Sequence, residues 1–174
     1  ANGTDYEDSI SFINDGIYYL RYASADKSGN VQDTVSKTVK IDTQNPVTAQ
    51  ITIPNDGDYV KGDVVIQATA TDNEGGSGIA KVEFYHDSNN NLIGTDFQVD
   101  AGIYEVTWST TAADDGEHSL YIIAYDQAGN ILPSNYRMIT VDNTPPTLES
   151  YSVTGGTPEA NNNVYFSPNG DNVM

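Results

Sequence analysis

The sequence predicts an all-β protein made of small two-sheet sandwiches with antiparallel strands. Three observations predict this fold class. Apolar and polar residues alternate over short segments, turn residues recur about every 8 to 12 positions, and one stretch of the chain repeats another. No segment has the apolar period of about 3.6 residues that is typical of a helix. Hydrophobic residues make up 37% of the chain, which suits small cores better than one large core.

The internal repeat sets the domain organisation. Residues 15–46 align without a gap to residues 115–146 at an offset of 100. The identical positions are Asp15, Gly16, Leu20, Asp26, Gly29, Asn30, Asp42 and Pro46, which match Asp115, Gly116, Leu120, Asp126, Gly129, Asn130, Asp142 and Pro146. An offset of this size is the length of one sandwich domain.

Three segments follow from this offset. We predict the C-terminal half of one module at 1–43, a complete module at 44–143 and the start of a third module at 144–174. Proline at Pro46, and at Pro145 and Pro146, prevents a strand from continuing across the two boundaries. We therefore expect the chain to be an excerpt of a longer protein.

Seven strands are expected within the complete module. They fall at 50–53, 64–70, 81–85, 92–99, 104–108, 120–124 and 136–141. Side chains alternate between the two faces of a strand, so one face of each segment is expected to enter the core. The expected core residues are Val64, Ile66, Ala68, Ala70, Val82, Phe84, Tyr104, Val106, Trp108, Leu120, Ile122 and Ala124.

Most of this module resembles a known family. The stretch PVTAQITIPNDGDYVKGDVVIQATATDNEGGSGIAKVEFYHD, followed by LIGT, YEVTWSTT and DGEHSLYIIAYDQAGN, resembles the bacterial Ig-like modules of large secreted and cell-surface proteins. The likeness covers nearly all of 46–142, and ISFINDGIYYLRYASADKSGN in the first segment resembles a sister subtype. The tail FSPNGDN resembles the FSPNGDG opening of modules in subtilisin-like cell-envelope proteases, with Asn172 in place of the last glycine.

The resemblance implies tandem immunoglobulin-like or fibronectin-III-like antiparallel β-sandwiches. It implies non-catalytic architecture in an extracellular or cell-surface protein. A rigid spacer or stalk is the leading interpretation of that role. The alternatives are a module that binds carbohydrate or a surface, and an accessory region of a secreted protease or glycoside hydrolase.

Charge and composition narrow the possible partners. Seven Lys and Arg against 25 Asp and Glu give a formal net charge of −18, which repels nucleic acid and anionic membranes. The chain has no cysteine, so disulfides and thiolate metal sites are excluded. No apolar run reaches the length of about 18 residues needed for membrane insertion. The expected partners are adjacent modules of the same chain, with cell-wall polysaccharide or a host surface as further candidates.

No residue pattern predicts catalysis. Residues 75–78 read GGSG, but Ile79 breaks the G-x-S-x-G pattern of a nucleophile elbow, so a tight turn is the better interpretation. His86 and His118 are the only histidines; they lack an H-x-x-x-H spacing and are expected to face solvent. A glycosidase carboxylate pair would need a sugar-sized cleft, which a sandwich of about 100 residues rarely offers. We therefore predict that the chain is not an enzyme.

Calcium at the module junctions is the sharpest hypothesis. In this topology the loop after the second strand and the loop before the last strand lie at the pole that faces the preceding module. Carboxylates and amides from those loops and from the entering linker are the candidate ligands: Asp42, Asn45, Asp72, Glu74, Asp126 and Asn130, with Asp142 at the next junction. Ca²⁺ prefers six to eight oxygen ligands of these kinds.

Two structural interpretations compete with ligand binding. In Asp-x-x-Gly-Asn the aspartate can accept backbone N–H groups across a tight turn, so its recurrence at Asp26 and Asp126 needs no ion. Tyr19, Tyr121 and Tyr125 are expected on outer strand faces, where they could stack on sugars or simply pack along the strands. The sequence leaves both questions open.

Overall fold

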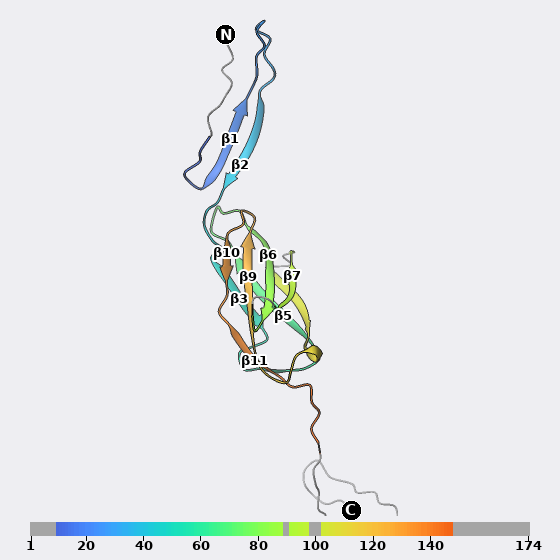
Figure 1. Ribbon diagram of the computed structural model, residues 1–174. Helices are drawn as coiled ribbons and strands as arrows, with labels where there is room; N and C mark the ends of the chain where they lie inside the picture. The colour runs from blue at the N-terminus through green and yellow to red at the C-terminus, as the bar shows by residue number, and fades with distance from the viewer. Residues whose placement is uncertain (1–9, 89–90, 98–101, 148–174) are drawn as a thin grey trace, which may run out of the picture. The chain divides into compact units, whose positions relative to one another are not determined.

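The protein is all-β, which confirms the predicted fold class. The computed structural model describes residues 10–88, 91–97 and 102–147, and the first compact unit of the chain ends at Thr144. Its described residues form strands and one 3-10 turn, η1 (Thr110–Ala112), with no α-helix among them (Figure 1). Consequently no helix within these ranges is long and apolar enough to cross a membrane. The FSPNGDN tail lies outside the described residues.

The first two strands form a hairpin. β1 (Gly16–Tyr22) pairs antiparallel with β2 (Val35–Ile41), and beyond the paired strands Ala25 forms a bridge with Val31. This hairpin is a two-stranded sheet with no strand of the following sandwich hydrogen-bonded to it.

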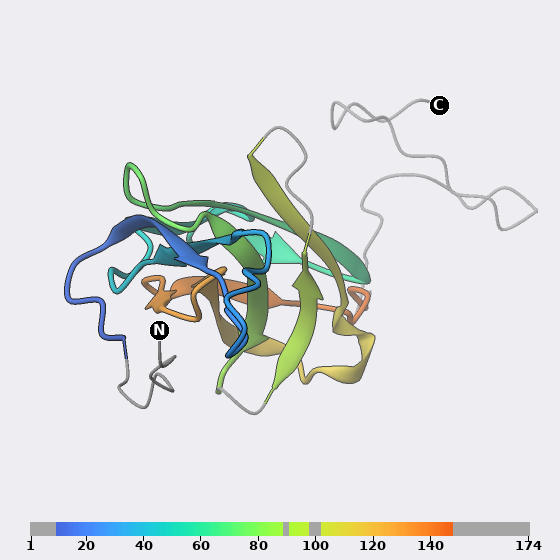
Figure 2. The same ribbon diagram turned by 90° about the horizontal axis from the view of Figure 1, so that it is seen from above.

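The following strands form a two-sheet sandwich. They are β3 (Thr48–Ile53), β4 (Tyr59–Val60), β5 (Asp63–Thr71), β6 (Ile79–His86), β7 (Leu92–Asp96), β8 (Ile103–Ser109), β9 (Gly116–Asp126), β10 (Ile131–Pro133) and β11 (Arg137–Val141). The larger sheet has the order β4-β11-β9-β6-β7, with β10 also paired to β9, and the smaller sheet has the order β3-β5-β8 (Figures 1 and 2). Every pair of strands is antiparallel except β11 with β4, which run parallel.

The core lies between the two sheets. Period-2 alternation turns Ile66, Ala68 and Ala70 of β5 towards Val82 and Phe84 of β6, and these side chains form one buried cluster. The other expected core residues join it, except that Val64 is only half-buried and Val106 packs at the margin of the cluster. Full burial of each large apolar side chain stabilises the fold by about 1.5–3 kcal/mol.

The hairpin repeats the register of β9 with β10 and β11. Each of the following pairs in the hairpin has a counterpart 100 positions later: Gly16 with Ile41 and Gly116 with Val141, Leu20 with Lys37 and Leu120 with Arg137, Ala25 with Val31 and Tyr125 with Ile131. The hydrogen bonds repeat too, because the carboxylates of Asp15 and Asp115 accept the N–H groups of Thr43 and Asn143. The sequence repeat is therefore also a repeat of backbone pairing.

The strand expected at 136–141 is present as β11, but the prediction missed the short strand β10 that precedes it. Between them Ser134 replaces regular pairing: its N–H donates to the Ile122 carbonyl, and its Oγ accepts the Ile122 N–H at 3.0 Å. The prediction also missed β4, a strand of two residues, and β7 ends at Asp96 where 92–99 was expected.

Candidate functional sites

Three carboxylates meet where the chain enters the sandwich. Asp42 follows β2, Asp72 follows β5, and Asp126 ends β9. Each offers a carboxylate oxygen, and these oxygens all lie within 4.8 Å of one another. Asp126 is only 3% exposed. We call these three residues the junction cluster.

Backbone donors hold the linker aspartate of the junction cluster. Asp42 Oδ2 accepts the Ser77 N–H at 2.7 Å, and Oδ1 accepts the Gln44 N–H at 3.2 Å. The first of these bonds is the main reason that the pKa of Asp42 is lowered. The Asp42 carbonyl also accepts the side-chain NH₂ of Asn130 at 3.2 Å, so the linker contacts both loops at this end of the sandwich.

The two loop aspartates are held in the same manner. Asp72 accepts the N–H of Asn73 at 2.9 Å and the N–H of Gly78 at 2.6 Å. Asp126 accepts the N–H and the side-chain NH₂ of Asn130 at 2.8 and 2.7 Å. Asp26 makes the same two bonds to Asn30 in the hairpin, so in both copies the aspartate makes the hydrogen bonds that a tight turn requires. Gly129 permits the turn, with φ at +95°.

The junction cluster has no partner of opposite charge among the described residues, where Lys81 forms an ion pair only with Glu83. Beside the cluster, the side-chain oxygen of Asn73 is buried without a hydrogen-bond partner in the described part of the chain. A methyl group added at Gly76 would lie 2.7 Å from both that oxygen and Asp72 Oδ2. Oxygen acceptors are therefore in excess at this end of the sandwich, a condition that a cation relieves.

The remaining predicted ligands lie in different places. Asn130 is part of the hydrogen-bond network of the junction cluster. Asn45 and Glu74 are exposed, and neither belongs to the group of converging oxygens. Asp142 lies beyond β11, where its Oδ1 accepts the Thr144 N–H at 3.2 Å, as Asp42 does with Gln44. It is therefore at the opposite end of the module from the junction cluster.

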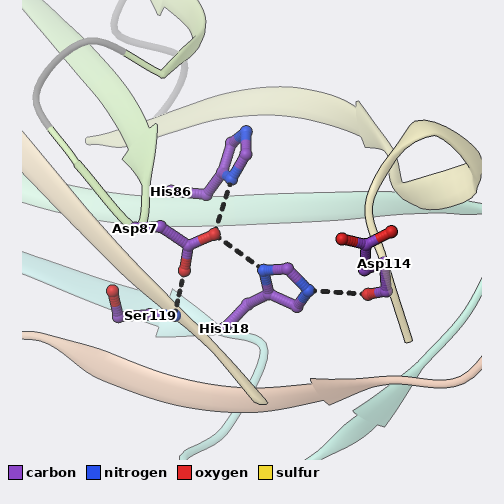
Figure 3. Close-up of polar contacts among 5 residues, drawn as sticks. All are labelled: His86, Asp87, Asp114, His118 and Ser119. Atoms are coloured by element: carbon purple, nitrogen blue, oxygen red, sulfur yellow. Dashed lines mark hydrogen bonds and ion pairs between the residues drawn. The ribbon is translucent and has the colours of Figure 1, made fainter. Parts of the chain in front are cut away.

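The two histidines form a second cluster with Asp87. His86 Nδ1 and His118 Nδ1 lie 3.1 and 2.7 Å from the same oxygen, Asp87 Oδ2 (Figure 3). Solvent-facing histidines were expected, and this prediction is wrong: their side chains are only 24% and 13% exposed. Trp108 shields both histidines from solvent. Its ring stacks on that of His86, with 4.9 Å between the ring centroids, and contacts the His118 ring edge-on, with 5.9 Å between the centroids.

Hydrogen bonds shift the pKa values of His118 and Asp87 in this second cluster. His118 Nε2 lies 2.8 Å from the Asp114 carbonyl oxygen. Burial lowers the pKa of His118, but bonds to Asp114 and Asp87 outweigh it and raise the pKa above its ordinary value. Burial likewise raises the pKa of Asp87, and bonds from His118, the Ser119 N–H and His86 outweigh it and lower the pKa.

The outer tyrosines pack against their neighbours. Tyr121 and Tyr125 do lie on the face opposite the core, as predicted, but Tyr121 is only 7% exposed and its ring stacks against Tyr85 at 5.1 Å. The hydroxyls of Tyr85 and Tyr125 both donate to Glu83 Oε2. Tyr85, Tyr121 and Tyr125 are therefore held by stacking and by hydrogen bonds to Glu83, and these three rings do not form an open planar surface.

An open groove of about 560 Å³ runs between β3 and the segment from Leu132 to Arg137. Its two charged side chains are already engaged: Asp56 accepts the Met138 N–H at 2.8 Å, and the Arg137 guanidinium donates to the Ile51 carbonyl. The groove therefore offers no acid–base pair for catalysis.

Comparison with known families agrees with this architecture. Residues 46–122, from the buried proline of the linker to the middle of β9, match the bacterial Ig domain family. This segment is similar to bacterial Ig domains. Bacterial Ig domains are non-catalytic modules, which agrees with the prediction that the chain is not an enzyme. No curated protein sequence matches the chain significantly.

Several solved structures resemble part of this chain. An endo-β-1,4-mannanase from Thermotoga petrophila is 21% identical over 59% of this chain and 21% of its own, with a TM-score of 0.46. The fibronectin(III)-like modules of Clostridium thermocellum CbhA are 25% identical over 54% of this chain and 94% of theirs, with a TM-score of 0.45. Dimeric latent PorU from Porphyromonas gingivalis is 16% identical over 76% of this chain and 13% of its own, with a TM-score of 0.39. This chain thus spans about a fifth of the mannanase and less of PorU.

Proposed function

We propose that this Ig-like module is a non-catalytic spacer in an extracellular or cell-surface protein, and that Ca²⁺ stiffens its junction with the preceding hairpin. The observation that carries the proposal is the junction cluster. The linker aspartate Asp42 converges there with the two loop aspartates, Asp72 and Asp126. An ion bound by all three would tie the linker to both loops and restrict the hinge.

The chemistry of the junction cluster favours a hard cation. Its ligand atoms are carboxylate oxygens, the type that Ca²⁺ prefers, at Ca–O distances of about 2.3–2.6 Å. Two oxygens bound to one Ca²⁺ are therefore at most about 4.6–5.2 Å apart, and the three carboxylate oxygens, all within 4.8 Å of one another, satisfy this condition. The oxygen of Asn73 beside Asp72 is a further candidate ligand.

An extracellular setting is part of this proposal, because calcium sites in extracellular modules need a Kd of only about 10⁻⁴–10⁻³ M. Repeated hairpin registers support the proposal that adjacent modules of the same chain are the main partners. A spacer of this type is compatible with a parent protein that is a secreted protease or glycosidase. The packed tyrosines give no support to a carbohydrate-binding role.

Calcium titration tests the proposal directly. We expect the melting temperature of the chain to be higher in Ca²⁺ than in EDTA. We also expect small-angle scattering to show a narrower distribution of molecular dimensions in Ca²⁺, because the hinge is restricted. At about 2 mM Ca²⁺ and the Kd range above, linkage gives about 0.7–1.8 kcal/mol of stabilisation. Asp72→Asn should abolish most of this effect.

The matched control is Asp63→Asn, an exposed carboxylate at the other end of β5. It should leave the Ca²⁺ effect unchanged. Identical melting temperatures and scattering dimensions in Ca²⁺ and EDTA would contradict the proposal. The junction cluster would then serve only to form hydrogen bonds.

A further inference from the structure

The His86, Asp87 and His118 cluster lies at the opposite end of the sandwich from the junction cluster. His86 ends β6 and pairs with Leu120 of β9, whereas Ile79 at the start of β6 pairs with Asp126. The cluster therefore joins the β6–β7 turn to the beginning of β9. It contains both histidines of the chain.

The hydrogen bonds of His118 leave an electron pair directed at a carboxylate. Its Nε2 faces the Asp114 carbonyl oxygen at 2.8 Å, and because that oxygen can only accept, Nε2 carries a proton. In the neutral ring Nδ1 is then an acceptor, yet it lies 2.7 Å from Asp87 Oδ2, which is also an acceptor (Figure 3). Two acceptors at this separation need a cation between them, either a proton or a metal ion.

This arrangement is the one that metal-binding histidines adopt. A ligating imidazole usually donates its second N–H to a backbone carbonyl or a carboxylate, which fixes the tautomer and the orientation of the ring. The Asp114 carbonyl does this for His118. His86 Nδ1 faces the same Asp87 oxygen, so two imidazole nitrogens and one carboxylate oxygen lie within 4.8 Å of one another.

The spacing of the three atoms fits a small ion. Ligands about 2.1 Å from a metal are about 3.0 Å apart at a right angle and about 3.4 Å apart at the tetrahedral angle. The observed separations from Asp87 Oδ2, 2.7 Å to His118 Nδ1 and 3.1 Å to His86 Nδ1, are within a few tenths of an ångström of the right-angle value. A right-angle geometry at the metal therefore requires shifts of only a few tenths of an ångström in these two separations.

The ligands are also held in place before any ion binds. Asp87 has φ at +56°, an uncommon conformation for a residue with a side chain. It is fixed by a reciprocal pair of bonds with Ser119: its N–H donates to the Ser119 carbonyl at 2.8 Å, and its Oδ1 accepts the Ser119 N–H at 2.9 Å. The ring of Trp108 packs on both imidazoles.

We propose that His86 Nδ1, Asp87 Oδ2 and His118 Nδ1 form a binding site for a borderline divalent transition-metal ion such as Zn²⁺, Cu²⁺ or Ni²⁺. Imidazole nitrogen suits these metals, whereas Ca²⁺ is bound by oxygen ligands alone. Water completes the coordination, since three protein atoms leave at least one position open. The ion crosslinks the β6–β7 turn to β9, and the site is independent of the junction cluster.

The sole tryptophan of the chain provides a direct readout. Trp108 stacks on His86, so Cu²⁺ or Ni²⁺ bound there should quench its fluorescence. The full chain, produced without a polyhistidine tag, is titrated with CuCl₂ or NiCl₂ in millimolar Ca²⁺, which occupies carboxylate-only sites. Calorimetry with ZnCl₂ gives the stoichiometry. We expect one ion per chain, with an affinity lowered at least about tenfold by His86→Gln and by His118→Gln.

Asp72→Asn, which alters only the junction cluster, is the matched control and should leave the transition-metal affinity unchanged. Non-saturable binding, or equal affinity in wild type and both histidine variants, would overturn the proposal. Circular dichroism checks that the variants fold. Electron paramagnetic resonance of the wild-type Cu²⁺ complex is decisive whatever the variants do: coupling to two imidazole nitrogens supports the site, and its absence rejects it.

Discussion

Asp126 gives the most quantitative prediction, because it is a nearly buried carboxylate with a defined set of bonds. It is 3% exposed and accepts two hydrogen bonds from Asn130. Asp126→Ala removes both acceptors and leaves the N–H and NH₂ groups of a half-buried residue without partners. Hydrogen bonds to charged groups contribute about 1.5–3 kcal/mol each, and some of this is recovered as water reaches Asn130. We expect the free energy of unfolding to fall by about 2–4 kcal/mol.

Urea unfolding followed by Trp108 fluorescence measures this change. EDTA is present throughout, so that bound Ca²⁺ does not contribute to the difference. Glu117→Ala is the matched control, because this exposed residue of the same strand forms no side-chain hydrogen bond with the described residues and should change stability by less than about 0.5 kcal/mol. Equal losses in the two variants would refute the argument that the buried carboxylate organises its loop.

Three further predictions concern the core, a turn and the outer face of the sandwich. Phe84 is 1% exposed, so Phe84→Ala should lower the free energy of unfolding by about 3–5 kcal/mol in urea titrations. Gly129→Ala places a side chain at φ +95° and should cost about 1–2 kcal/mol by the same assay. Burial raises the pKa of Glu83, but bonds from Lys81, Tyr85 and Tyr125 outweigh it and lower the pKa below 4.5. The contribution of Glu83 to stability is therefore fully present above pH 4.5 and lost as the pH falls through the folded-state pKa. Glu83→Gln should flatten the fall in stability on acidification, measured as urea midpoints across that range.

Each of these three has an outcome that contradicts it. The core argument requires that Phe84→Leu cost clearly less than Phe84→Ala. If Gly129→Ala matched the wild type while the neighbouring exposed change Gln127→Ala did not, the backbone explanation would be wrong. If the urea midpoints of wild type and Glu83→Gln depended on pH in the same way, Glu83 would not contribute to the loss of stability in acid.

Much of the fold could be predicted from the sequence because local signals and global structure agree. Alternation along β5 and β9 correctly identified buried residues such as Ile66 and Ile122. Two strands were not predictable in this way. β4 has two residues, too few to show alternation, and β10 is separated from β11 by Ser134, whose hydroxyl takes the place of a backbone group.

The candidate sites were predictable only where topology alone brings residues together. Loops at one pole of a sandwich converge in any register, so Asp42, Asp72 and Asp126 could be grouped from strand order. The histidine cluster depends on the register between β6 and β9, which places His118 beside the turn that follows His86. Predicting the histidine cluster from the sequence would have required the register between β6 and β9.

The most direct test of the account is the stability of residues 44–143 expressed alone. If the module is self-contained, it will unfold in one cooperative transition monitored by Trp108 and by circular dichroism. Its free energy of unfolding should lie within about 2 kcal/mol of that of the full chain, because the hydrogen bonds it loses among the described residues are chiefly those of Asp42 and Thr144. An unfolded or non-cooperative fragment would contradict the modular architecture on which the spacer proposal rests.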